Sequence, residues 1–196
     1  MSGLAPKRRS NARKFCKGCP FHGPKVGWRG NPEAPVVIVG ESPGPQEVRE
    51  GLPFFEKAPS GSLLWGLVPG GTDADVLVTN ALECSPPQKT KDQTVIAEAC
   101  GCCHDRLVSQ ITAYPRRIIL ALGNAAAWSL TGDFGIKITQ DRGQTIPSEL
   151  AQLGIMPIVH PAALFHGSGS FRQFKGDLEY SFHLASGGRL RTFTEP

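Results

Sequence analysis

The hydrophobic residues of this chain gather in short runs that are separated by longer, mixed segments. Each run is continuous rather than alternating, and each is rich in β-branched or aliphatic residues. Continuous apolar runs of this length are typical of strands whose two faces are both covered. The sequence therefore predicts four buried strands, at residues 36–39, 76–79, 118–122 and 155–159.

Helical periodicity fills the segments between these runs. The clearest example is residues 93–113, where one helix face would carry Ile96, Cys100, Cys103, Leu107 and Ile111. Further helices are predicted at 60–67, 124–130 and 171–185, and residues 135–147 are expected to form a small hairpin or a loop. Strands that alternate with helices are typical of α/β proteins. We therefore expect an α/β fold, a three-layer αβα sandwich around a central, mostly parallel four-stranded sheet.

Polar residues stand at the ends of three predicted strands. Glu41 comes after the first strand, Asn80 after the second, and His160 after the fourth. Ligands bind at the carboxyl ends of the strands in open parallel sheets, so we expect these side chains to line one cleft. Taken singly, each has a structural alternative: a helix cap for Glu41, a turn for Asn80 and a satisfied loop histidine for His160. Their shared position favours the functional interpretation.

The length and composition suit one compact domain. The chain has 196 residues, 40% of them hydrophobic, and no apolar run long enough to cross a bilayer. No apolar segment follows the basic N-terminus, so we expect no secretory signal, an intracellular (cytoplasmic) location and no membrane partner. We divide the chain into a flexible basic arm (1–12), one domain (13–185) and a C-terminal tail (186–196), and we expect a monomer.

Positive charge is concentrated at the N-terminus. The net charge is +4, but residues 1–30 carry eight of the 21 basic residues and no acidic one. The rest of the chain holds 13 bases against 17 acids. A basic arm on a mildly acidic body favours a polyanionic partner such as nucleic acid. A solvated leader without a partner is the alternative that charge alone leaves open.

Six cysteines in a chain without a secretory signal argue against a disulfide scaffold and favour a metal site. Four of them are candidate ligands: Cys16, Cys19, Cys84 and either Cys100 or Cys103. Cys102 is expected to point elsewhere. Four thiolates suit tetrahedral zinc or an iron–sulfur cluster, and spacing does not separate the two. Reduced core cysteines without a metal are the structural alternative.

Seven short motifs occur in an order and at spacings that resemble one enzyme family. They read CKGC (16–19), GESPG (40–44), GLPF (51–54), TNALECSPP (79–87), a helix with Cys100 and Cys103, ALG (121–123) and HPAAL (160–164). The closing FKGDLEYSF also resembles the family's last helix. Together, over about residues 14–185, they resemble the iron–sulfur uracil-DNA glycosylases of family 4.

The resemblance implies an enzyme of base-excision repair that flips uracil out of DNA and hydrolyses its N-glycosidic bond, leaving an abasic site. Glu41 and His160 would then be catalytic. Glu41 would orient or activate water, or stabilise positive charge on the sugar, and His160 would stabilise negative charge on the departing base. A 4Fe-4S cluster, structural rather than redox-active, is the implied cofactor.

The resemblance also implies a base-binding set, namely Gly40, Ser42, Phe54 and Asn80. Phe54 can stack on the flipped base. The Asn80 amide can pair with the polar edge of uracil and disfavour cytosine. Backbone N–H groups from Gly40 onward can contact the base as well.

The segment after His160 would face the DNA. Leu164 or Phe165 is a candidate wedge for the space that the base vacates, with a buried loop anchor as the alternative. His166 and Arg172 lie where phosphate would be met and, with the basic arm, would supply salt-dependent affinity. We therefore expect single- or double-stranded DNA containing uracil as the partner, and association with the nucleoid.

Several positions depart from the family pattern. Ser42 replaces the usual Ala, Ala162 the usual Ser, and Phe55 and Glu56 a Val-Gly-like pair. These departures keep open a glycosylase for another base, such as hypoxanthine or a modified pyrimidine. A non-catalytic DNA-binding module, or a zinc module on an unrelated α/β hydrolase, also remains open.

The fourth cysteine ligand is ambiguous. Spacing from Cys84 favours Cys100, whereas spacing from the downstream ALG motif favours Cys103. Insertions are tolerated better in the loop that follows Cys84 than in the helix and strand that follow Cys103. The sequence therefore favours Cys103.

Overall fold

The computed structural model describes residues 18–87, 90, 92–167 and 169–189. At its centre lies a sheet in the strand order β1-β3-β2-β4-β5. The strands are β1 (Arg29–Gly30), β2 (Val36–Gly40), β3 (Val76–Asn80), β4 (Ile118–Leu122) and β5 (Ile155–Ile158). β2 to β5 pair in parallel and are buried along their whole length, as their continuous apolar sequences predict.

The prediction of four strands is wrong, because the sheet has five and is mixed. β1 pairs antiparallel with the edge of β3, Arg29 with Val78 and Gly30 with Leu77. A pair of residues without an apolar run carries no strand signal of its own. Gly30 has a φ of 97°, and a Cβ there would lie 2.1 Å from the carbonyl oxygen of Val76, so glycine alone permits this approach.

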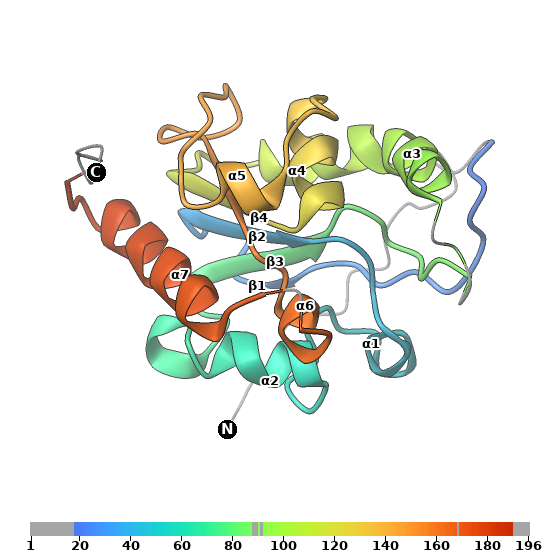
Figure 1. The fold of residues 1–196 in the computed structure, drawn as a ribbon, viewed down its shortest axis with the longest axis horizontal. Helices are drawn as coiled ribbons and strands as arrows, with labels where there is room; N and C mark the ends of the chain where they lie inside the picture. The colour runs from blue at the N-terminus through green and yellow to red at the C-terminus, as the bar shows by residue number, and fades with distance from the viewer. Residues whose placement is uncertain (1–17, 88–89, 91, 168, 190–196) are drawn as a thin grey trace.

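Helices cover both faces of the sheet (Figure 1). α3 (Gln93–Ile111) and α4 (Asn124–Thr131) pack on one face, and α2 (Pro59–Trp65) and α7 (Phe171–Ala185) on the other. These are the four helices that the sequence predicts, with ends displaced by at most two residues.

Three further helices carry too few residues to show a period in the sequence. They are α1 (Pro45–Glu50), α5 (Ile138–Asp141) and α6 (Pro161–Phe165). α5 lies within residues 135–147, where the sequence predicted a hairpin or a loop, and Ile146 of that segment also bridges to Ile155. α1 and α6 both begin at a proline, whose fixed φ suits a first helical position. A 3₁₀ turn, η1 (Pro69–Gly71), follows α2.

Two apolar clusters, one on each face of the sheet, hold these layers together. The first includes the whole predicted face of α3, which is buried: Ile96, Cys100, Cys103, Leu107 and Ile111. The second includes Phe174, Leu178 and Leu184 of α7. Each fully buried side chain of this kind contributes about 1.5–3 kcal/mol, so the sheet is a rigid support for the residues at its ends.

Some sequence predictions lie outside the described residues. They concern the basic arm at 1–12, Cys16 and the C-terminal tail from residue 190 onward. Within the ranges that are described, no helix has the length and apolar character needed to span a membrane.

Candidate active site

The carboxyl ends of β2 and β3 lie side by side and bring two predicted site residues together. Gly40 pairs with Asn80, and the ladder continues beyond the strands, since Leu82 N–H donates to the carbonyl oxygen of Glu41 at 2.9 Å. A Cβ on Gly40 would lie 2.3 Å from Asn80 Oδ1 and 2.7 Å from the ring of Phe54. Gly40 is therefore required because the Asn80 amide and the Phe54 ring both lie against it.

A cavity of about 340 Å³ opens beside this point. Five of the predicted site residues line it: Glu41, Ser42, Phe54, His160 and His166. The ring centroids of Phe54 and His160 are 5.9 Å apart, so the two rings form one wall. Ala162 also lines the cavity, whereas Glu56 is exposed and forms an ion pair with Arg29 at 2.9 Å. Of the positions that depart from the family pattern, Ser42 and Ala162 are thus placed to affect what the cavity binds.

Phe54 is held in an uncommon backbone conformation. Its φ is 47°, in the left-handed region that non-glycine residues rarely adopt. The neighbouring loop is also close to α2, because a Cβ on Gly61 would lie 2.0 Å from the carbonyl oxygen of Phe55. Such conformations persist where the surroundings fix them, and they cluster at functional sites.

Two buried side chains that the sequence analysis missed fix this conformation. The Glu47 carboxylate accepts the backbone N–H groups of Phe54 and Gly44. The indole N–H of Trp65 donates to the carbonyl oxygen of Phe54 at 2.6 Å. Burial raises the pKa of Glu47, and these backbone hydrogen bonds oppose the rise. Gly44 has no side chain to complete a capping box, so the local signal is only a glutamate, Glu47, three residues after that glycine. Nothing in the local sequence marks Trp65.

Asn80 is positioned by a third residue that the sequence analysis missed, Arg106 of α3. The buried Arg106 guanidinium donates to the carbonyl oxygens of Asn80 at 2.9 Å and Ala81 at 2.7 Å. The Asn80 Nδ2 group is itself buried, with no hydrogen-bond partner among the described residues. The backbone of Asn80 is therefore clamped while its amide donor remains available to a ligand.

His160 caps α6, and this contact determines its tautomer. Its Nδ1 accepts the backbone N–H of Ala162 at 3.1 Å, so the proton of the neutral ring is on Nε2. Burial lowers the pKa of His160 to about 4. Near neutral pH the ring is therefore uncharged and can donate one hydrogen bond through Nε2. Burial also raises the pKa of Glu41 above its ordinary value.

The model of the Uracil DNA glycosylase superfamily matches residues 28–179. The chain belongs to this superfamily. The match includes every residue that lines the cavity described above.

Curated members of the superfamily match over most of their length. The Type-4 uracil-DNA glycosylase of Archaeoglobus fulgidus is 30% identical over 84% of this chain and 85% of its own. The Type-4 uracil-DNA glycosylase of Pyrobaculum aerophilum is 32% identical over 93% of this chain and 94% of its own. The Type-4 uracil-DNA glycosylase of Thermotoga maritima is 33% identical over 77% of this chain and 78% of its own. The resemblance found from the motifs is therefore confirmed.

The four predicted DNA-contact residues differ in their surroundings. Phe165, at the end of α6, has 56% of its surface exposed, whereas Leu164 is half-buried and packs against the second apolar cluster. His166 lines the cavity, and Arg172 is exposed at the start of α7, outside the cavity lining. In this superfamily member, Phe165 is thus the more exposed of the two candidate wedges.

Four predicted cysteine ligands lie within the described residues and share one environment. Cys19, Cys84, Cys100 and Cys103 are all buried in the first apolar cluster. Burial raises the pKa of Cys100 to about 12, and its Sγ lies 3.9 Å from the carbonyl oxygen of Ala125 on α4. Cys84 lies 3.7 Å from the carbonyl oxygen of Gly23, in the loop that follows Cys19.

The sequence predicted that Cys102 points away from the other thiols. That prediction is wrong, because Cys102 lies beside Cys19. Burial raises the pKa of Cys102, and the neighbouring Cys19 thiol adds to the rise. Within the described ranges, no three histidine, cysteine or acidic side chains are close enough together to hold a metal ion. The thiols nevertheless provide the soft donors that zinc or an iron–sulfur cluster needs, gathered in one part of the core.

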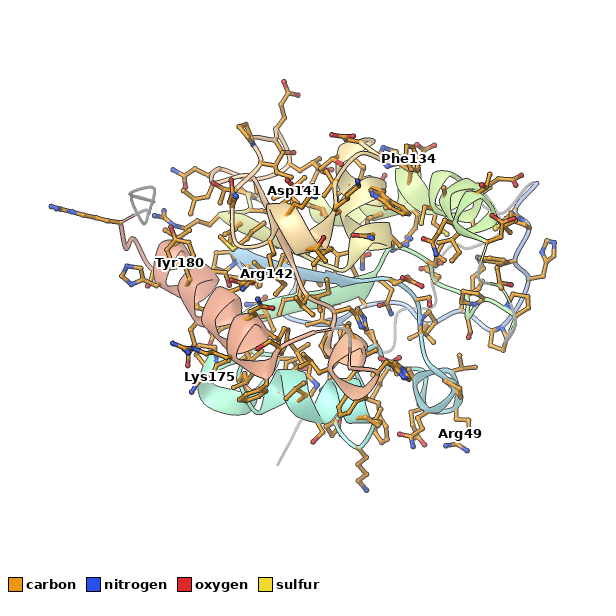
Figure 2. The ribbon with its side chains drawn as sticks, viewed as in Figure 1. Arg49, Phe134, Asp141, Arg142, Lys175 and Tyr180 are labelled. Carbon is orange, nitrogen blue, oxygen red and sulfur yellow. The ribbon has the colours of Figure 1, made fainter. Side chains whose placement is uncertain are left out.

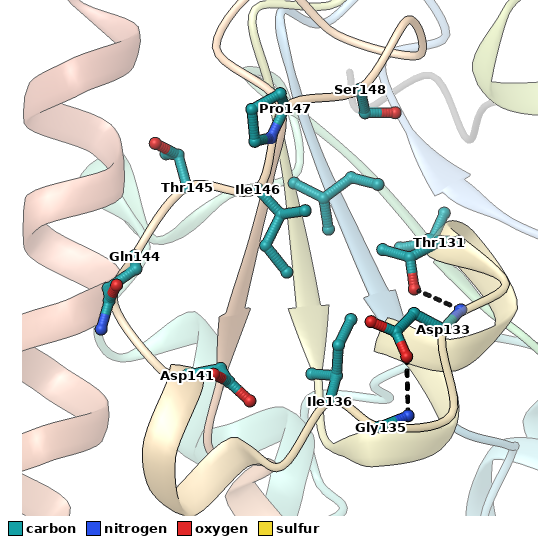
Figure 3. A pocket seen from close by; sticks show the side chains of 12 residues that line it. Thr131, Asp133, Gly135, Ile136, Asp141, Gln144, Thr145, Ile146, Pro147 and Ser148 are labelled. Atoms are coloured by element: carbon teal, nitrogen blue, oxygen red, sulfur yellow. Dashed lines mark hydrogen bonds between the residues drawn. The ribbon is translucent and has the colours of Figure 1, made fainter.

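A larger cavity, of about 540 Å³, lies elsewhere, between α4, α5 and β5 (Figure 3). Its two carboxylates already have local roles. Asp133 accepts the N–H of Gly135 at 2.7 Å, and Asp141 accepts the N–H of Lys137 at 2.8 Å. None of the predicted site residues lines this cavity, so the smaller one is the candidate active site.

Proposed function

We propose that this chain is a uracil-DNA glycosylase, which flips deoxyuridine out of DNA and hydrolyses its N-glycosidic bond. The observation that carries the proposal is the contact of both Phe54 and Asn80 with Gly40, beside Glu41 and a neutral His160. The names of the relatives support the same activity. Extruding the base costs a few kcal/mol, which contacts inside the cavity must offset.

Recognition of the base falls to Phe54 and Asn80. The Phe54 ring stacks on the flipped base. The buried Asn80 Nδ2 donates to the carbonyl oxygen at position 4 of uracil, and its Oδ1 accepts the N–H at position 3. Cytosine presents an amino group and a bare ring nitrogen at these positions, so donor would face donor. Leaving a buried donor unpaired costs about 1–3 kcal/mol, which favours uracil.

His160 stabilises the leaving base. The bond breaks as negative charge develops on the uracil ring, and a neutral Nε2–H directed at its carbonyl oxygen lowers the energy of that anion. The Ala162 N–H on Nδ1 keeps this tautomer in place. The Gly40–Gly44 turn adds backbone N–H groups near the base.

Glu41 acts on the sugar side of the bond. In its ionised form, the carboxylate orients the attacking water and stabilises the positive charge that develops on the sugar. The partial burial that raises its pKa also strengthens these interactions, since the local dielectric is low.

DNA is held outside the cavity by the segment that follows α6. Phe165 enters the space that the flipped base vacates, while His166 and Arg172 meet phosphates. Residues 1–12 add non-specific affinity through their basic side chains.

The cofactor that we propose is a 4Fe-4S cluster bound by Cys16, Cys19, Cys84 and Cys103, with Cys100 as the alternative fourth ligand. Such a cluster supplies a structural crosslink between the N-terminal loop and the body of the domain, since glycosidic hydrolysis needs no electron transfer. The burial of Cys19, Cys84 and Cys103 in one apolar cluster supports this proposal.

The test is base release from matched oligonucleotides that carry uracil, hypoxanthine or no lesion. We expect uracil to be released, and Glu41→Ala and His160→Ala each to lower the rate about 100-fold or more while DNA affinity is kept. The exposed residues Glu149 and His183, outside the cavity, provide matched controls as Glu149→Ala and His183→Ala. Near-wild-type rates for both active-site variants would refute the assignment of Glu41 and His160. Release of hypoxanthine alone would show that the enzyme acts on hypoxanthine and not on uracil.

A further inference from the structure

A second, apolar groove of about 430 Å³ lies next to the base cavity, and the mechanism above assigns a role only to Phe165 among the residues that line it. Leu63 of α2 and Leu67, just after that helix, line it together with Phe165 of α6 and Phe171 of α7. Phe165 is 56% exposed and Phe171 is 52% exposed. Two large aromatic side chains that both remain exposed in one groove indicate a binding surface.

The groove and the base cavity share a wall. Ser60 of α2 and Ala163 and His166 at α6 line the base cavity, whereas Leu63 and Phe165, on the same two helices, line the groove. A nucleotide in the cavity would thus have its neighbour in the strand within reach of Phe165 and Phe171.

The charge around the groove suits a phosphate backbone. Lys57 precedes α2, and Arg172 and Lys175 lie in the first turns of α7. All three are exposed, and Lys175 also forms an exposed ion pair with Glu179 at 3.6 Å. In Figure 2, Lys175 on α7 and Arg49 on α1 lie on either side of α2 and α6. A DNA strand that crosses this edge of the molecule would pass a basic side chain on each side of the groove.

The size of the groove favours a planar ring over a protein. A volume of about 430 Å³ is within the range of about 300–1,000 Å³ that is usual for small-molecule sites. A stable protein partner would bury roughly 1,200 Å² or more, beyond what two phenylalanines and two leucines provide. Every nucleobase has a flat π-face that stacks on aromatic side chains without regard to sequence.

We infer that this groove binds an unpaired nucleobase next to the flipped nucleotide, stacked on Phe171 and Phe165. The inference rests on the proposed function, because it places DNA across the base cavity. In a duplex the neighbouring bases are paired and stacked, so the groove is engaged by single-stranded or locally opened DNA. It therefore adds affinity for single strands that is independent of uracil.

The experiment measures binding of the full chain to single-stranded and double-stranded oligonucleotides without uracil. Phe171→Ala is expected to lower the single-strand affinity about tenfold and to leave the duplex affinity unchanged. Phe171→Tyr, which keeps a stacking ring, is expected to retain the affinity. Phe134→Ala is the matched control, because Phe134 is also exposed (59%) but packs beside Trp128 on α4.

A second readout locates the base. In a single strand with an abasic-site analogue, the fluorescence of a neighbouring 2-aminopurine should change on binding to the wild type and to Phe171→Tyr, but not on binding to Phe171→Ala. Unchanged single-strand affinity of Phe171→Ala, or an equal loss for single strands and duplex, overturns the inference. A dimer that Phe171→Ala abolishes, seen by sedimentation, would also overturn it, because the groove would then belong to a second copy.

The two proposals fail separately. All the probes lack uracil, so loss of single-strand affinity in Phe171→Ala supports the groove even if the protein releases no uracil. Conversely, uracil release with normal binding by Phe171→Ala supports the glycosylase and rejects the groove.

Discussion

At the scale of single residues, the backbone of Phe54 determines where its ring lies in the cavity. Its left-handed conformation is supported from both sides, by Glu47 at its N–H and by Trp65 at its carbonyl oxygen. Arg29 stacks over the Trp65 ring at 4.7 Å and so ties this support to β1. Two other side chains, Glu47 and Trp65, therefore determine where Phe54 lies.

Trp65→Phe tests this positioning role. It keeps the buried ring but removes the indole N–H, which leaves the Phe54 carbonyl oxygen unpaired at a cost of about 1–3 kcal/mol. We expect about a tenfold loss in kcat/KM for uracil release, mainly through KM, because stacking on the flipped base is impaired. Steady-state kinetics with thermal unfolding checks this.

Trp128→Phe is the matched control for that variant. The Trp128 indole N–H donates to the carbonyl oxygen of Ile136 at 2.9 Å, beside α4 and away from the base cavity. Trp128→Phe should lower the free energy of unfolding by an amount similar to that of Trp65→Phe, without changing KM. Equal kinetic effects of the two substitutions would show that Trp65 acts through stability alone.

At the scale of secondary-structure elements, α3 connects the cysteines with Asn80, which we propose recognises the base. Its buried face carries Cys100 and Cys103, and one turn further on Arg106 clamps the backbone of Asn80. A change in how α3 packs would therefore change the position of Asn80.

The two candidate ligands on α3 can be separated by substitution. Cys100 Sγ faces the carbonyl oxygen of Ala125, so we expect Cys103 to be the fourth ligand. Anaerobically purified Cys103→Ser should lose the broad visible absorption and the iron content, whereas Cys100→Ser should keep both. Cys102→Ser is the control. Loss of iron in Cys100→Ser alone would reverse the assignment, and zinc in the wild type would reject the cluster.

At the scale of the whole molecule, charge and shape suit a polyanion that crosses one edge. The base cavity and the apolar groove lie at the same edge, around α2 and α6. The eight basic residues among the first 30 give the chain a cationic N-terminus. Affinity for DNA should therefore depend strongly on salt and weakly on sequence.

Deletion of residues 1–12 measures what the arm contributes. The deletion removes Lys7, Arg8 and Arg9, so the slope of log affinity against log salt should become shallower by up to about 3. Replacing the same three residues by glutamine, which keeps the length, should have the same effect. Binding at low salt that is indifferent to both changes would refute the role of the arm.

The sequence by itself determined the parts of this protein that depend on local patterns. The apolar runs identify β2 to β5, the periodicity of residues 93–111 identifies the buried face of α3, and Glu41 and His160 are found by their place at strand ends. Such features can be read because a strand covered on both faces and an amphipathic helix each require a continuous pattern.

Only the tertiary structure decided the features that depend on contacts between distant segments. β1 exists because Gly30 can approach Val76, and Phe54 is strained because Glu47 and Trp65 hold it. Arg106 reaches Asn80 across 26 positions of sequence. The groove likewise needs α2, α6 and α7 to meet. In each case the determining interaction joins groups that no local pattern links, so it appears only when the chain is folded.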